Sequence, residues 1–95
     1  MDRIKNYAYI PDYTNKTTIP NGDFVAPSNG VIVGYTTSVN NNCYVKDVES
    51  DNQLIYIYQT GAYSDPSKTQ VIVEKGKVYN VSKSGGQVYF YPFKL

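Results

Sequence analysis

Histidine and tryptophan are absent from this 95-residue chain, cysteine occurs once, and no long run of apolar residues is present. Because Cys43 is the only cysteine, no disulfide forms within the chain, and without histidine a Cys/His metal site is excluded. A Ser/His or Cys/His nucleophile pair is excluded for the same reason. We therefore expect no enzymatic activity, no catalytic residue, no cofactor and no metal site, and we place Cys43 in the core as a small apolar residue.

The chain also lacks an excess of charge of either sign: it has nine Lys and Arg residues and eight Asp and Glu residues, for a net charge of +1. The basic residues are scattered and form no stripe that would follow a phosphate backbone, so we expect no nucleic-acid partner. No apolar segment is long enough for a membrane span, and the polar first six residues lack a signal-peptide core. We expect synthesis in a cytoplasm, release without a secretory signal, and no membrane insertion.

The acidic residues suggest two kinds of site that their spacing does not support. Asp47, Glu49 and Asp51 recur at every second position, as at the start of a calcium-binding loop. The sixth position of that loop is Asn52 instead of glycine, and the twelfth is Tyr58 instead of glutamate. The pattern instead predicts a solvated strand end that leads into a turn. Glycoside hydrolysis needs a carboxylate pair across a cleft, and no spacing in this chain selects one.

Tyrosine is abundant, with eleven residues alongside three phenylalanines. Its apolar ring and single hydroxyl suit half-hydrated surfaces and interfaces, where it stacks on a sugar or base, anchors a partner, or covers a sheet face. In the longest loop, residues 61–67, Tyr63 with Ser64 and Asp65 forms our candidate ligand contact, because loops on rigid scaffolds often carry recognition. For tyrosines inside strands we favour a structural role.

Short strands separated by turn signals account for most of the chain, and no segment has apolar residues at helical spacing over three turns. This pattern predicts an all-β, antiparallel β-sandwich of seven or eight short strands, jelly-roll-like in arrangement. We expect one domain at residues 17–95, preceded by an N-terminal arm at residues 1–16. The expected strands are Thr17–Ile19, Phe24–Val25, Val31–Thr37, Cys43–Glu49, Leu54–Tyr58, Val71–Val73, Lys77–Ser82 and Gln87–Lys94.

The run Val31-Ile32-Val33 is apolar at every position, which predicts a strand that is buried on both faces or covered by a partner on one. Pro27 and Asn29-Gly30 before it are typical of a tight turn. The aromatic arm is expected to dock, either on its own domain or on a neighbouring chain.

Two strands, Leu54–Tyr58 and Gln87–Phe93, have apolar residues on both faces. In a small domain without disulfides such faces would expose apolar surface, which a closed symmetric oligomer would bury. We therefore predict a homo-oligomer with a subunit interface formed by Ile55, Ile57, Tyr56, Tyr58, Tyr89 and Tyr91.

Four segments carry a resemblance to a known family: residues 24–33, residues 73–79, residues 85–95 and the Pro-Asp-Tyr lead-in at residues 10–13. They resemble the Ala-Pro-Ser-Asp-Gly opening, the Val-x-Lys-Gly-Asp hairpin and the aromatic closing strand of small β-sandwich head domains of bacteriophage tail fibres and other virion fibres. Lys77 stands where that hairpin often has aspartate. The resemblance implies a jelly-roll-like sandwich, commonly a homotrimer, that is displayed on a virion.

The resemblance leads us to expect a phage virion structural protein at a tail-fibre tip or in capsid or tail decoration, located at the virion surface. Its expected partners are further copies of itself, with a trimer favoured, other virion proteins through the arm, and a host-surface glycan or protein. The alternative function is a monomeric carbohydrate-binding or adhesion module of a bacterial cell surface. The two differ in oligomeric state, so the solution mass distinguishes them.

Overall fold

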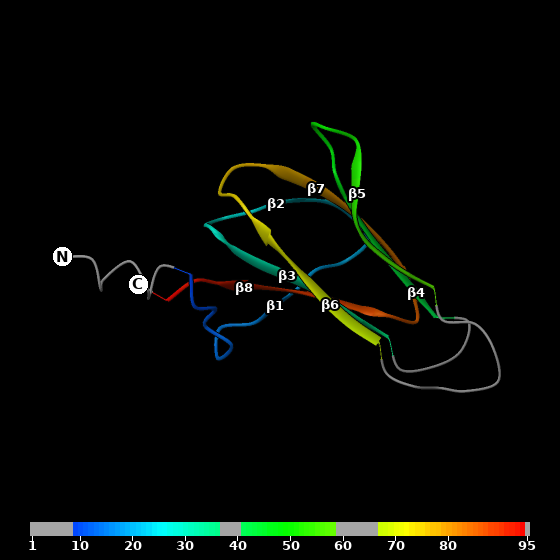
Figure 1. Cartoon of the computed structure of the whole chain (residues 1–95), viewed down its shortest axis with the longest axis horizontal. Helices are drawn as coiled ribbons and strands as arrows, with labels where there is room; N and C mark the ends of the chain where they lie inside the picture. Colours follow the sequence, from blue (N-terminus) through cyan, green and yellow to red (C-terminus); the bar gives the residue numbers. More distant parts are fainter. Residues whose placement is uncertain (1–8, 37–40, 59–66, 95) are drawn as a thin grey trace.

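The computed structural model describes residues 9–36, 41–58 and 67–94, and Figure 1 shows their arrangement. Within these ranges all regular structure is β-strand, which confirms the predicted all-β class. No helix in the described ranges has the length and apolar character to cross a membrane. The strands are β1 (Thr17–Thr18), β2 (Gly22–Val25), β3 (Gly30–Thr36), β4 (Asn42–Asp47), β5 (Asn52–Tyr58), β6 (Ser67–Val73), β7 (Val78–Ser84) and β8 (Gln87–Pro92).

The strands form two four-stranded antiparallel sheets with the orders β1-β8-β3-β6 and β2-β7-β4-β5. The pairs β4–β5, β3–β6, β2–β7 and β1–β8 are those of one long hairpin folded over on itself, and the pairs β3–β8 and β4–β7 close each sheet. This order is that of a jelly roll, so the predicted architecture and strand number are confirmed. Strand β6 begins at Ser67, earlier than the predicted Val71, because its first residues are polar and carry no apolar signal.

The core lies between the two sheets and is filled by the inward side chains of both. Cys43 is fully buried there, which confirms its predicted place, and burial raises the pKa of its thiol. The rings of Phe24 on β2 and Phe90 on β8 meet with centroids 5.5 Å apart and so connect one sheet to the other. The fully packed cluster comprises Ile19, Ala26, Ile32, Cys43, Val45, Ile55, Val73, Tyr79, Val81, Val88 and Phe90.

Strand β3 is buried on both faces, as its apolar run predicted. Its outer-face residues Val31 and Val33 are nearly inaccessible although they point away from the core. Tyr91 on β8 pairs with Val31, and Gln70 on β6 pairs with Val33, so both lie on this outer face. Tyr13 packs on the ring of Tyr91 at 4.9 Å and donates a hydrogen bond to Gln70 Oε1 at 3.3 Å. The arm therefore crosses over β3 and covers it.

The described part of the arm, residues 9–16, docks on its own chain beyond the end of β8. The main-chain nitrogen of Asp12 donates to the carbonyl of Pro92 at 2.7 Å, and that of Lys94 donates to the carbonyl of Ile10 at 2.7 Å. In this structure the described residues of the arm are therefore hydrogen-bonded to their own chain.

The turn between β2 and β3 packs against the turn between β6 and β7. The main chain of Ala26 donates to the carbonyl of Lys77 at 3.1 Å and accepts from the nitrogen of Gly76 at 2.9 Å. The side-chain oxygen of Asn29 accepts a hydrogen bond from the nitrogen of Lys75 at 2.8 Å. Gly76 has a φ of +85°, a conformation that favours glycine. Two turns that are far apart in the sequence therefore form one hydrogen-bonded unit.

Candidate functional site

The predicted site residues fall in different parts of the fold. Tyr63, Ser64 and Asp65, the candidate ligand contact, lie outside the described residues. The six predicted interface residues do not form one continuous surface. They divide into a core pair, a pair beneath the arm and an exposed pair, which are Ile55 with Ile57, Tyr89 with Tyr91, and Tyr56 with Tyr58 respectively.

Ile55 belongs to the core of its own chain, so its side chain is not available to the predicted subunit contact. It is 1% exposed, and a Cβ on the neighbouring Gly34 would lie 3.0 Å from its Cγ2 methyl. Ile57, on the same inward face of β5, is half-buried and packs against the core. The physical reason is that one of the two apolar faces of β5 is the face that closes the sandwich.

Tyr89 and Tyr91 are half-buried, because the arm of the same chain covers them. The ring of Tyr13 meets that of Tyr91 edge-on, and the ammonium of Lys16 lies 4.4 Å from the ring centroid of Tyr89. Burial, with Tyr89 and Tyr13 close by, raises the pKa of Tyr91. Much of this aromatic surface is thus already occupied within one chain.

The outer row of β5 exposes three large side chains. Leu54, Tyr56 and Tyr58 are 36%, 68% and 51% exposed. The ring of Tyr56 packs on that of Tyr44 in β4, with centroids 4.9 Å apart and planes 36° apart. Burial raises the pKa of Tyr44, and the nearby hydroxyls of Tyr56 and Tyr58 add to this effect. The three tyrosines therefore gather on one face.

A groove of about 710 Å³ runs beside β5, between the free edges of the two sheets. Residues 54–58 of β5 form one wall, and Lys68 and Thr69 of β6 contribute to the other. Ile55 also lines the groove, although the whole residue is only 1% exposed. Its carbonyl accepts a hydrogen bond of 3.3 Å from the side-chain amide of Gln53. The groove thus lies where the next strand of this sheet would be placed, and we call β5 with this groove the β5 edge.

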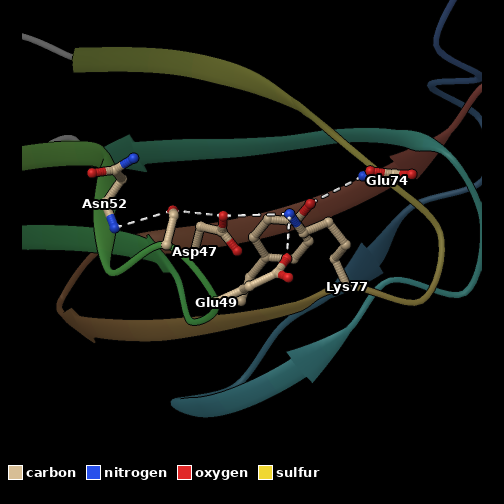
Figure 2. Close-up of polar contacts among 7 residues, drawn as sticks. Asp47, Glu49, Asn52, Glu74 and Lys77 are labelled. Atoms are coloured by element: carbon tan, nitrogen blue, oxygen red, sulfur yellow. Dashed lines mark hydrogen bonds and ion pairs between the residues drawn. The ribbon is translucent and has the colours of Figure 1, made fainter.

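A cluster of polar and charged side chains lies at the end of β4 and is shown in Figure 2. Asp47 is only 8% exposed, so it is not the solvated strand end that the sequence predicted. Its Oδ2 atom accepts a 2.7 Å hydrogen bond from the hydroxyl of Ser50 and lies 3.5 Å from Lys77 Nζ. The same ammonium lies 2.9 Å from Glu49 Oε1. Glu49 and Asp51 are well exposed, as predicted.

This cluster joins the β4–β5 hairpin to the turn that precedes β7. The hydrogen bond from Ser50 and the charge of Lys77 hold the pKa of Asp47 below its usual value, and pairing with Glu49 and Asp47 raises the pKa of Lys77. Asp47 Oδ1 has no hydrogen-bond partner among the described residues. In those same ranges no three His, Cys, Asp or Glu side chains come together as metal ligands. The arrangement is that of a structural ion pair.

We expect Asp47→Asn to reduce the amount by which the free energy of unfolding falls between neutral and acidic pH. Because the pKa of Asp47 is lower in the folded chain than the value of about 3.9 in an unfolded chain, its charged form stabilises the fold above about pH 4. This contribution is lost as the pH falls through the folded-state pKa. Urea unfolding from neutral to strongly acidic pH should show a shallower acid loss in the variant than in the wild type. The exposed Asp51→Asn serves as control, and an equal effect of both variants would contradict this role of Asp47.

Comparisons of the chain with models of protein families, with curated proteins and with solved structures found no match. The site is therefore interpreted from its geometry. Sequence reasoning identified the residues of the exposed row of β5 but did not identify the groove, because a groove between two sheet edges appears only once the strand order is known.

Proposed function

We propose that this protein is a non-catalytic structural component of a bacteriophage virion, at a tail-fibre tip or as a capsid or tail decoration, and that it attaches the particle to a host surface. The observation that supports this proposal is the contact between the β2–β3 turn and the β6–β7 turn. The Ala-Pro-Ser-Asn-Gly segment and the Lys-Gly hairpin that resemble virion-fibre heads are hydrogen-bonded to each other. The resemblance therefore rests on one joined unit of a jelly roll, a fold that viral capsid proteins also use.

The surface chemistry suits binding without catalysis. Exposed tyrosines offer apolar rings and hydroxyls to a glycan or a protein, and Tyr63 remains the predicted contact in the 61–67 segment. Polar residues at the turns of a rigid sandwich allow recognition without rearrangement of the sheets. The carboxylates at the end of β4 are occupied by Lys77 and Lys46, which fits a structural role for them.

Immunogold labelling of particles produced by the phage that encodes this chain tests the virion location, with regular labelling at a defined position expected. The purified full chain should also bind host cells saturably and reduce phage adsorption as its concentration rises to saturation. Tyr63→Ala should weaken this competition, while Val25→Ala on β2 should not. Label on bacterial cell surfaces with none on particles would overturn the proposal in favour of a cellular adhesion module.

A further inference from the structure

A pocket of about 460 Å³ lies on the outer face of the β1-β8-β3-β6 sheet, at the end where β3 begins. Its lining residues are Tyr9 of the arm, Asn29 of the β2–β3 turn, Ile72, Val73 and Glu74 at the end of β6, and Phe93 after β8. Ile72 pairs with Val31, so its side chain lies on the same outer face that the arm crosses. We call this the arm pocket.

The arm pocket has large apolar side chains on both sides of β3, and two of them are well exposed. Tyr9 and Ile72 are 69% and 67% exposed. The ring of Tyr9 meets that of Phe93 edge-on, with centroids 5.9 Å apart. Because β3 lies between β8 and β6, the aromatic pair stands on one side of it and Ile72 on the other. A ligand in the pocket would therefore find apolar contacts on two sides.

Two polar side chains of the arm pocket have hydrogen-bonding capacity that the described residues do not use. Asn29 Oδ1 accepts a hydrogen bond from the nitrogen of Lys75 at 2.8 Å, which leaves the NH₂ group of this amide as a donor. Among residues 9–36, 41–58 and 67–94 no Lys or Arg pairs with the Glu74 carboxylate, so it remains an acceptor. Small-molecule sites usually measure about 300–1,000 Å³ and combine apolar walls with a few polar groups. The arm pocket has this size and this composition.

We propose that the arm pocket binds a neutral saccharide. A sugar ring packs its C–H groups on aromatic and aliphatic side chains, and its hydroxyls both accept from the Asn29 amide and donate to the Glu74 carboxylate. A cationic ligand such as a lysine side chain has donors alone and would leave the Asn29 donor without an acceptor. The Glu74 carboxylate repels an anionic ligand, and a wholly apolar segment would bury both polar groups unpaired. A neutral molecule rich in hydroxyls satisfies every group in the pocket.

This inference identifies a glycan as the host-surface partner, so its biological meaning rests on the proposed attachment function. The binding itself does not depend on that function, because it follows from the pocket alone. The arm pocket also lies apart from Tyr63, the contact predicted from the sequence, so the two sites are tested by different variants.

Titration of the isotope-labelled full chain with the methyl glycosides of glucose, galactose, mannose and N-acetylglucosamine, followed by amide NMR shifts, tests the proposal. At least one of these sugars should cause saturable shifts at millimolar concentration, largest at Ile72, Glu74 and Phe93. Tyr9→Ala should weaken that binding by about two- to tenfold, as expected for the loss of one aromatic contact. Tyr56→Ala is the matched control, because it removes a tyrosine of similar exposure, 68%, from the β5 edge on the other sheet. It should bind the sugar like the wild type.

Glu74→Gln tests the preference for a neutral ligand. The methyl uronide of the sugar that binds has the same ring with an added carboxylate, and the wild type should bind it more weakly than the neutral sugar. Glu74→Gln should narrow this difference, because the variant no longer repels the carboxylate. Amide shifts outside the pocket show whether each variant is folded, and Ile72→Thr serves as a second variant if Tyr9→Ala is not.

Three results would overturn the proposal. They are no binding by any of the four glycosides, binding that Tyr9→Ala and Ile72→Thr leave unchanged, and a uronide that binds the wild type as well as the neutral sugar. Pocket shifts that follow protein concentration alone would overturn it too, because a second copy of the chain would then occupy the pocket. Saccharide binding without immunogold label on particles would retain the pocket and reject the virion role, and labelled particles without saccharide binding would do the reverse.

Discussion

Gly30→Ala is expected to leave the chain unfolded under conditions in which the wild type is folded. A Cβ at this position would run into the main-chain carbonyl oxygen of Tyr91 and would lie 2.9 Å from both the ring of Phe90 and the Cα of Pro92. Gly30 pairs with Pro92, so these atoms belong to the neighbouring strand β8. Main-chain atoms of a central strand pair cannot move aside as the end of a flexible side chain does. The clash is relieved only by separating β3 from β8.

The expected cost is more than about 4 kcal/mol, a value that marks exceptional single substitutions. Small domains have a total stability of about 5–15 kcal/mol, and a 95-residue chain belongs near the lower end. Far-UV circular dichroism without denaturant shows whether Gly30→Ala is unfolded, and urea unfolding measures the loss for a variant that remains folded. Gly76→Ala is the matched control, because a Cβ there meets nothing within 4 Å and only its φ of +85° is unfavourable. That change should cost about 1–2 kcal/mol. Equal losses for the two variants would contradict the close approach of β3 and β8.

Most strands of this protein could be predicted from its sequence, because they contain runs of β-branched residues or alternating apolar residues. The run at Val31–Val33 predicted burial on both faces correctly. Its cover, Tyr13, was not predictable, because the arm has no periodicity and the contact depends on where β8 and β6 place Tyr91 and Gln70. The first residues of β6, Ser67–Gln70, were missed because they are held by main-chain pairing with β3, which leaves no mark on side-chain type.

The candidate site could be predicted only in part. The sequence does not show which face of a strand meets the other sheet, or which residues distant in the sequence come into contact. Alternation along β5 separated Ile55 from Tyr56, but both faces are apolar, so the sequence did not say which one meets the other sheet. Alternation along β4 likewise placed Asp47 on the same face as the buried Cys43. The burial of this carboxylate depends on Lys77, which is thirty residues away in the sequence and reaches it only through the jelly-roll pairing of β4 with β7.

Phe90→Ala is expected to have the second largest effect on stability. Phe90 is a fully buried side chain on the inward face of β8, and its ring meets that of Phe24 on the opposite sheet. Removal of this ring deletes the contact between the sheets and opens a cavity at a place that cannot collapse, because Gly30 leaves β3 without a side chain there. A buried Phe→Ala change costs about 3–5 kcal/mol. Chemical denaturation should show this loss with a wild-type m-value.

Two further variants test whether the loss of stability comes from the contact of Phe90 between the sheets or follows any substitution in β8. Phe90→Leu keeps most of the apolar volume and should cost less than about 1.5 kcal/mol. Tyr89→Ala changes the next residue, which is half-buried on the outer face beneath Lys16, and should cost about 1 kcal/mol. If Tyr89→Ala proved as damaging as Phe90→Ala, the arm instead of the inter-sheet core would be the main source of stability. Because the chain has one cysteine and no internal disulfide to limit its unfolded state, a loss of the expected size at Phe90 would remove a large fraction of its total stability.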